Sequence, residues 1–117
     1  YLRAMRVRRL VQEAMGKVWA EVDVLVSPTS GEVAGAVRGG QNPEARTSTA
    51  MQIAGTSPLI SAGNLAGLPC LTLPAGFVSG LPVGISLTGM GFSENVLLKA
   101  GMYYQSKTDW HRSRPPA

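Results

Sequence analysis

Apolar residues recur every three or four positions through residues 1–22, which predicts an amphipathic helix. The apolar stripe of this helix consists of Ala4, Val7, Val11, Ala14, Met15, Val18 and Val22. Charged residues spaced four apart follow one another on the opposite side: Arg9, Glu13, Lys17 and Glu21. Side chains at this spacing can meet on a helix, so we interpret this side as the solvent-exposed face.

Three short apolar runs predict strands. Residues 24–26 form a continuous run that ends at Pro28, which is typical of a strand buried on both faces in a parallel sheet. In residues 71–73 and 83–87, large apolar side chains alternate with small ones, as in strands with one buried face. The link of residues 75–81 is short enough to predict that these two runs form an antiparallel hairpin.

The remaining pattern predicts two helical segments and one long loop. Residues 57–65 predict a helical turn or two, and residues 93–107 predict a helix with Ser93 as its N-cap. The predicted inward face of that last helix consists of Val96, Leu97, Ala100, Tyr103 and Tyr104. The loop at about 28–57 is rich in Gly, Ser, Thr and Ala, and residues 46–54 within it could form a short helix. A loop of this length is typically a lid, a docking segment or disordered. The alternation of helices and strands predicts an α/β fold.

Length and composition are those of a single folded segment. The 117 residues suit one small domain, and 44% hydrophobic against 15% charged residues excludes a disordered chain. The chain opens at Tyr1 inside a helical pattern, without an initiator Met or a capping residue, so we expect a piece of a longer protein. No apolar run approaches the ~20 residues of a membrane span, and we expect no membrane association. Cys70 has no partner for an internal disulfide, which fits a cytoplasmic protein.

The net charge of +4 has two interpretations. Arg3, Arg6, Arg8 and Arg9 crowd the first helix, as in a surface that binds nucleic acid or an acidic partner. The alternative is a solvated helix face. We favour the solvated face, because the neighbouring glutamates absorb part of the positive charge, and we do not expect nucleic acid as a partner.

The sequence contains few groups that carry chemistry. It has no phosphate-binding loop and no Gly-x-Ser-x-Gly pattern, and its acidic residues are dispersed. One His and one Cys cannot build a zinc site, so we expect no metal and no cofactor. A Cys70–His111 nucleophile–base pair is conceivable. We expect instead that Cys70 packs as a small apolar residue and that His111 lies in the terminal tail.

Seven short pieces resemble the C-terminal part of amidase signature enzymes, in that family's order. They are the Tyr1-x-x-Ala4 helix with its basic run, Asp23-Val-Leu-Val-Ser-Pro28-Thr29, Asn64-Leu-Ala-Gly67-Leu-Pro69, Leu73-Pro74-Ala-Gly76-Phe, Gly80-Leu-Pro82-Val-Gly84-Ile, Glu94-x-x-Leu97-Leu98 and Thr108-x-Trp110-His111. They cover nearly the whole chain except about residues 30–54. The resemblance implies the C-terminal part of the amidase signature fold, in which helices flank a mixed central β-sheet.

The same resemblance implies an amide hydrolase whose nucleophilic serine is activated through a second serine and a lysine. In the family this machinery lies in the N-terminal portion. Here no two serines are adjacent, and Lys17, Lys99 and Lys107 all lie on predicted surface helices. We therefore expect no catalytic residue in this chain and no activity of the chain alone. Its expected partners are the N-terminal portion of the same protein and a small-molecule amide; a homodimer is left open.

The family's C-terminal portion closes one wall of the substrate pocket, which makes Thr29, Ser57 and Asn64 the candidate substrate-binding residues. Each also has a purely structural interpretation. Thr29 could stabilise its own turn, Ser57 could cap a helical turn, and Asn64 could hydrogen-bond backbone in the loop before Pro69.

Two departures from the family bear on function. Ser86 stands where many members carry Gln. In the A subunits of glutamyl/aspartyl-tRNA amidotransferases, an acidic residue that binds the amino group of glutamine is expected several positions before Asn64. Residues 50–63 contain no Asp or Glu, and Ser57 lies nearest that place. This favours a general amidase with a less charged acyl substrate over such an amidotransferase. The third alternative is a non-catalytic interaction domain on the same scaffold.

Overall fold

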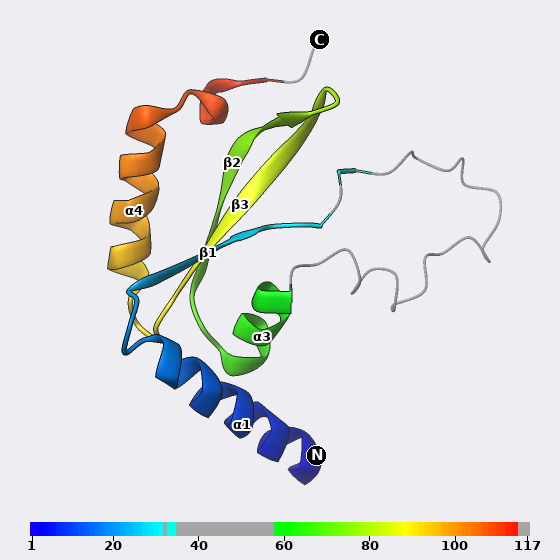
Figure 1. The fold of residues 1–117 in the computed structure, drawn as a ribbon, viewed down its shortest axis with the longest axis vertical. Coiled ribbons are helices and arrows are strands. Elements are labelled where there is room, and N and C mark those ends of the chain that lie inside the picture. The colour runs from blue at the N-terminus through cyan, green and yellow to red at the C-terminus, as the bar shows by residue number, and fades with distance from the viewer. Residues whose placement is uncertain (32, 35–57, 115–117) are drawn as a thin grey trace, which may run out of the picture.

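The computed structural model describes residues 1–31, 33–34 and 58–114. In this part of the chain, the elements are α1 (Leu2–Val18), β1 (Val24–Pro28), α3 (Pro58–Ala66), β2 (Cys70–Val78), β3 (Leu81–Gly89), α4 (Glu94–Lys107) and the 3-10 turn η2 (Trp110–Arg112) (Figure 1). The fold is the predicted α/β class. The predicted helix at 46–54 and most of the predicted loop at 28–57 lie outside the described residues.

The three described strands form one antiparallel sheet in the order β1-β3-β2. β2 and β3 make the predicted hairpin, with Leu71 opposite Leu87, and a bulge interrupts the pairing between Pro74 and Gly76. The two connecting residues have positive φ angles, 51° at Ser79 and 77° at Gly80. A two-residue turn of this kind matches the twist of the strands, so the hairpin is longer and tighter than predicted.

The prediction for β1 was wrong in direction and burial. β1 runs antiparallel to β3 at an edge of the described sheet, and Val26 is 61% exposed. A continuous apolar run is compatible with either direction of pairing, because the direction depends on the neighbouring strand. The burial was misjudged because α4 packs over β2 and β3, which leaves Val26 uncovered.

The core lies between α4 and one face of the sheet. Leu73, Leu87 and Leu97 are buried there, and Val24, Leu71, Ile85, Ala100 and Tyr104 pack against them. The predicted inward face of α4 was partly wrong, because Tyr103 is 69% exposed with Lys107 Nζ 5.6 Å from its ring centroid. The helix begins at the predicted N-cap, but the Ser93 hydroxyl accepts no hydrogen bond from the first helix amides and donates to Met90 O at 2.7 Å.

α1 extends away from the sheet, and its predicted apolar face is mostly open in the described part of the chain (Figure 1). Of the helix residues only Met15 is buried, and Val7 of the predicted face is 53% exposed. The helix ends at Val18 rather than at residue 22. On its other side Arg9 Nε donates to Glu13 Oε1 at 2.9 Å, which confirms one of the predicted pairs.

Gly67 ends α3 in a left-handed conformation with φ +79°. The amides of Gly67 and Leu68 both donate to Gly63 O at 2.9 Å, the pattern of a glycine C-cap. A Cβ at Gly67 would lie 3.0 Å from Nη2 of Arg8, which reaches over from α1. The glycine therefore permits both the end of α3 and the contact between the two helices.

Replacing Gly67 by alanine is expected to lower the free energy of unfolding by ~1–2 kcal/mol, because alanine must adopt the left-handed conformation. Denaturant unfolding measures this loss. Gly16→Ala is the matched control: nothing lies within 4 Å of its Cβ, and alanine favours a helix interior. A Gly67→Ala protein as stable as the Gly16→Ala protein would contradict this account of the cap.

Candidate functional site

The face of the sheet opposite α4 is lined by small polar side chains. Partners in an antiparallel pair point to the same side, and Ser86 pairs with both Ser27 and Thr72, while Thr88 pairs with Cys70. The polar side chains on this face are Ser27, Thr29, Cys70, Thr72, Ser86 and Thr88, and Leu25, which pairs with Thr88, lies beside them. The polar side chains all carry a hydroxyl or a thiol, and none carries a charged group at this sheet surface.

Three of these hydroxyls form a continuous chain across the three strands. Thr29 Oγ1 lies 2.8 Å from Ser86 Oγ, and Thr72 Oγ1 lies 3.2 Å from the same Ser86 oxygen. Ser86 is fully buried, at 0% exposure. We call Thr29, Ser86 and Thr72 the hydroxyl chain.

Gly84 permits Thr29 to approach the sheet so closely. The Thr29 amide donates to Gly84 O at 3.0 Å, which continues the β1–β3 pairing by one residue. A Cβ at Gly84 would lie 3.1 Å from Thr29 Oγ1 and 3.3 Å from Leu73 O. Because the Leu73 carbonyl is backbone, a larger residue at this position would displace Thr29 from Ser86.

A cavity of about 480 Å³ opens beside the hydroxyl chain. Its lining residues are Thr29, Ser30, Val33, Ala34, Thr72, Pro82, Val83 and Gly84. Both outer members of the chain therefore face the cavity, while Ser86 lies behind them. The described lining is neutral, so it can offer hydrogen bonds and apolar contact to a ligand but no ion pair.

The described part of the chain brings only one predicted site residue to this cavity. Thr29 lines it, and its hydroxyl contacts Ser86 across the sheet rather than its own turn. Asn64 is exposed on α3, where its backbone carbonyl accepts a hydrogen bond from the Gly67 amide at 3.3 Å. Ser57 lies outside the described residues.

Sequence reasoning missed the other two hydroxyls. The alternation in residues 71–73 and 83–87 placed Thr72 and Ser86 opposite the large apolar side chains, and small polar residues at those positions were the available signal. Thr88, further along the same face, donates to Cys70 Sγ at 3.8 Å, and neither residue lines the cavity. Cys70 is exposed, contrary to the expectation that it packs as an apolar residue, because α3 packs against the neighbouring β3.

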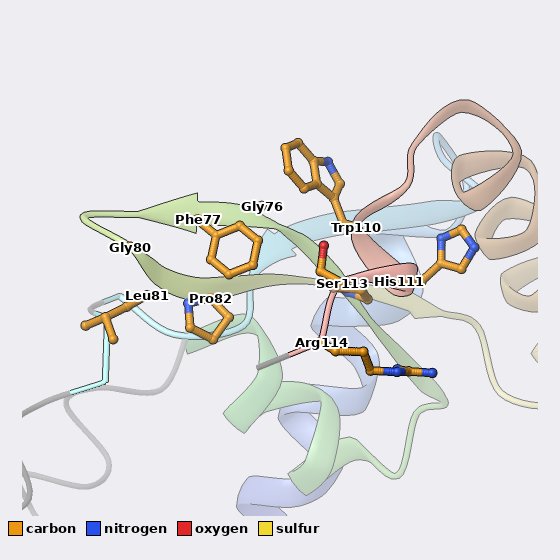
Figure 2. Close-up of a pocket in the computed structure, with 10 residues that line it drawn as sticks. Gly76, Phe77, Gly80, Leu81, Pro82, Trp110, His111, Ser113 and Arg114 are labelled. Carbon is orange, nitrogen blue, oxygen red and sulfur yellow. The ribbon is translucent and has the colours of Figure 1, made fainter. Parts of the chain in front are cut away.

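A second cavity, of about 570 Å³, lies between the hairpin tip and the segment around η2. Figure 2 shows Phe77 and Pro82 of the hairpin near the segment that carries Trp110 and Arg114. The Phe77 and Trp110 rings meet edge to face, with centroids 6.2 Å apart. His111 also lines this cavity, and its Nδ1 is buried without a hydrogen-bond partner among the described residues.

Cys70 and His111 do not form a nucleophile–base pair. His111 lies at the cavity near the hairpin tip, whereas Cys70 begins β2 at the opposite end of the hairpin. In the described part of the chain, no helix is both long enough and apolar enough to cross a membrane.

A family model and curated proteins both match most of the length of this chain. A family model described as Amidase matches residues 1–98. The A subunit of the glutamyl-tRNA(Gln) amidotransferase of Desulforudis audaxviator (strain MP104C) is 41% identical over 116 residues, which cover 99% of this chain and 22% of that protein. The chain thus spans about a fifth of the length of the curated relatives that it matches.

Solved structures of an amidotransferase A subunit and of a peptide amidase share the fold of this chain. The A subunit of the glutamyl-tRNA(Gln) amidotransferase from Thermotoga maritima aligns with a TM-score of 0.58 and 33% identity, over 78% of this chain and 19% of that chain. The native peptide amidase from Stenotrophomonas maltophilia aligns with a TM-score of 0.63 and 27% identity, over 96% of this chain and 21% of that chain.

Proposed function

Because this chain belongs to the amidase signature family, we propose that it is the C-terminal segment of an enzyme that hydrolyses carbon–nitrogen amide bonds. The observation that carries the proposal is the family match over residues 1–98, which includes every element that builds the sheet. In this proposal the Ser-Ser-Lys machinery lies upstream, and residues 1–117 form one segment of the amidase domain.

The proposed role of the segment is to form one wall of the substrate pocket. Thr29 is the best supported of the proposed substrate-binding residues, because it faces the neutral cavity beside the hydroxyl chain. Ser57 and Asn64 stay proposals on the family resemblance alone. The wall would hold the acyl part of an amide by hydrogen bonds and apolar contact, while the upstream serine attacks the carbonyl carbon.

A second candidate is the glutamine-hydrolysing component of a glutamyl-tRNA(Gln) amidotransferase, favoured by the 41% identity to that protein of Desulforudis audaxviator. Such a component would take glutamine and work with partner proteins. Glutamine carries an ammonium and a carboxylate, and each needs an opposite charge when it is desolvated. Residues 50–63 contain no acidic residue, and the described cavity lining is neutral. We therefore prefer the amidase with a neutral acyl substrate.

The proposal includes partners and a location. The upstream portion of the same protein is the proposed partner of α1, whose side chains Leu2 and Leu10 are 72% and 64% exposed. A cytoplasmic location is proposed from the single free Cys70. A homodimer stays a prediction, which the mass of the intact protein in solution would test.

The intact protein should release ammonia or an amine from neutral carboxamides and anilides, and a serine-directed sulfonyl fluoride should abolish this activity. The rate of ammonia release from a panel of neutral amides, compared with the rate from glutamine, distinguishes the amidase from the amidotransferase component. Glutamine hydrolysis that requires partner proteins would replace the amidase by the amidotransferase. An intact protein that hydrolyses neither would leave the interaction domain as the function.

A further inference from the structure

We propose that the hydroxyl chain binds a second, neutral amide group in the acyl part of the substrate, by offering it one hydrogen-bond donor and one acceptor. The proposal rests on the proposed function, since it names the substrate class of the same pocket.

Each of the three hydroxyl groups carries one proton, and two hydrogen bonds join the three oxygens. Ser86 is fully buried and Thr29 and Thr72 are its hydrogen-bond partners, so a proton that pointed away from both would meet neither water nor another of its partners among the described residues. Ser27, its cross-strand partner, does not take that proton, because its buried Oγ makes no hydrogen bond to the described residues. Ser86 must therefore donate to one threonine and accept from the other.

The direction of the two Ser86 hydrogen bonds determines whether each threonine offers a ligand a donor or an acceptor. The threonine that donates to Ser86 has only lone pairs left for a ligand, and the threonine that accepts from Ser86 keeps its own proton. Both Thr29 and Thr72 line the cavity. The hydroxyl chain thus offers the cavity one acceptor and one donor, and the burial of Ser86 couples them so that a bond at one end strengthens the bond at the other.

An amide group is the matching ligand. It carries a donor N–H and an acceptor C=O side by side, whereas a carboxylate has only acceptors and an ammonium only donors. Either of these ions would leave one end of the hydroxyl chain unpaired and would lack a counter-charge in the neutral described lining. Pro82 and Val83 flank the site with apolar surface, which suits the short carbon linker between two amide groups.

The test compares butanediamide with pentanamide as substrates of the intact protein. The two have similar length, and only butanediamide carries the second amide. Because two hydrogen bonds are gained, kcat/KM should be about tenfold higher for butanediamide. The anionic half-amide, succinamate, should be the poorest of the three.

Substitutions then assign the preference to the hydroxyl chain. Thr29→Val and Thr72→Val keep the side-chain shape but remove one of the two hydrogen bonds each, so in each variant the ratio should fall from tenfold to about threefold. Ser86→Ala only removes the coupling between the two threonines and should lower the ratio less. Thr88→Val is the matched control on the same face and strand, away from the cavity, and should keep the ratio. A ratio between two substrates of one variant is insensitive to partial loss of folded protein.

The outcomes separate the inference from the proposed function. If the intact protein hydrolyses both neutral amides equally well, or if both threonine variants keep the tenfold ratio, the inference is wrong and the amidase stands. If the intact protein hydrolyses no amide, the proposed function is wrong and the inference falls with it.

Discussion

Replacing Leu97 by alanine is expected to lower the free energy of unfolding of the intact protein by about 3 kcal/mol. Leu97 is 2% exposed and packs with Leu73 and Leu87 at the centre of the core between α4 and the sheet. A Cβ built at Gly89 would lie 3.1 Å from Leu97 Cδ2, so part of the leucine packs directly on backbone. A glycine has no side chain that could move into the space, and the cavity left by alanine would persist.

The matched control is Leu98→Ala, at the next position of the same helix. Leu98 is 56% exposed, so its truncation removes little buried surface and should cost less than about 1 kcal/mol. Urea unfolding of both variants, with equal denaturant slopes, gives the difference. Equal losses for the two variants would show that α4 does not pack as described.

The hairpin and α4 could be predicted because their signals are local. The alternation of Leu71 and Leu73, and of Ile85 and Leu87, identified the buried face of both strands. The direction of β1 could not be predicted in the same way, because nothing in residues 24–26 specifies the strand beside them. The extent of the inward face of α4 was also missed: Tyr103 is 69% exposed, whereas the adjacent Tyr104 packs against the core.

The candidate site was only partly predictable for the same physical reason. Thr29 was a candidate from the family resemblance, and the faces of Thr72 and Ser86 followed from strand alternation. The contact between Thr29 and Ser86 joins positions 57 residues apart, and the chain of three hydroxyls depends on β3 lying between β1 and β2. Strand order is a property of the packed sheet, so no local pattern could show that these hydroxyls meet.

The 117-residue chain on its own is expected to hydrolyse no amide above the uncatalysed background, while the intact protein turns amides over. Among the described residues no base lies beside the hydroxyl chain, and a serine or threonine hydroxyl needs one to become a nucleophile. Lys17, Lys99 and Lys107 are exposed on α1 and α4, where they cannot activate a hydroxyl of the polar face. Neither the nucleophile nor its base is therefore available in the described part of the chain.

Ammonia release by the purified chain, measured beside the intact protein at equal molar concentration, checks this expectation. Trace contamination by a host amidase is the main source of false turnover, so a Cys70→Ser, His111→Gln double variant prepared in parallel serves as the control. Turnover that the wild-type chain shows and this variant lacks would contradict the absence of a catalytic group. Turnover equal in both preparations would exclude Cys70 and His111 as its source, because the variant removes the only thiol and the only imidazole in the sequence.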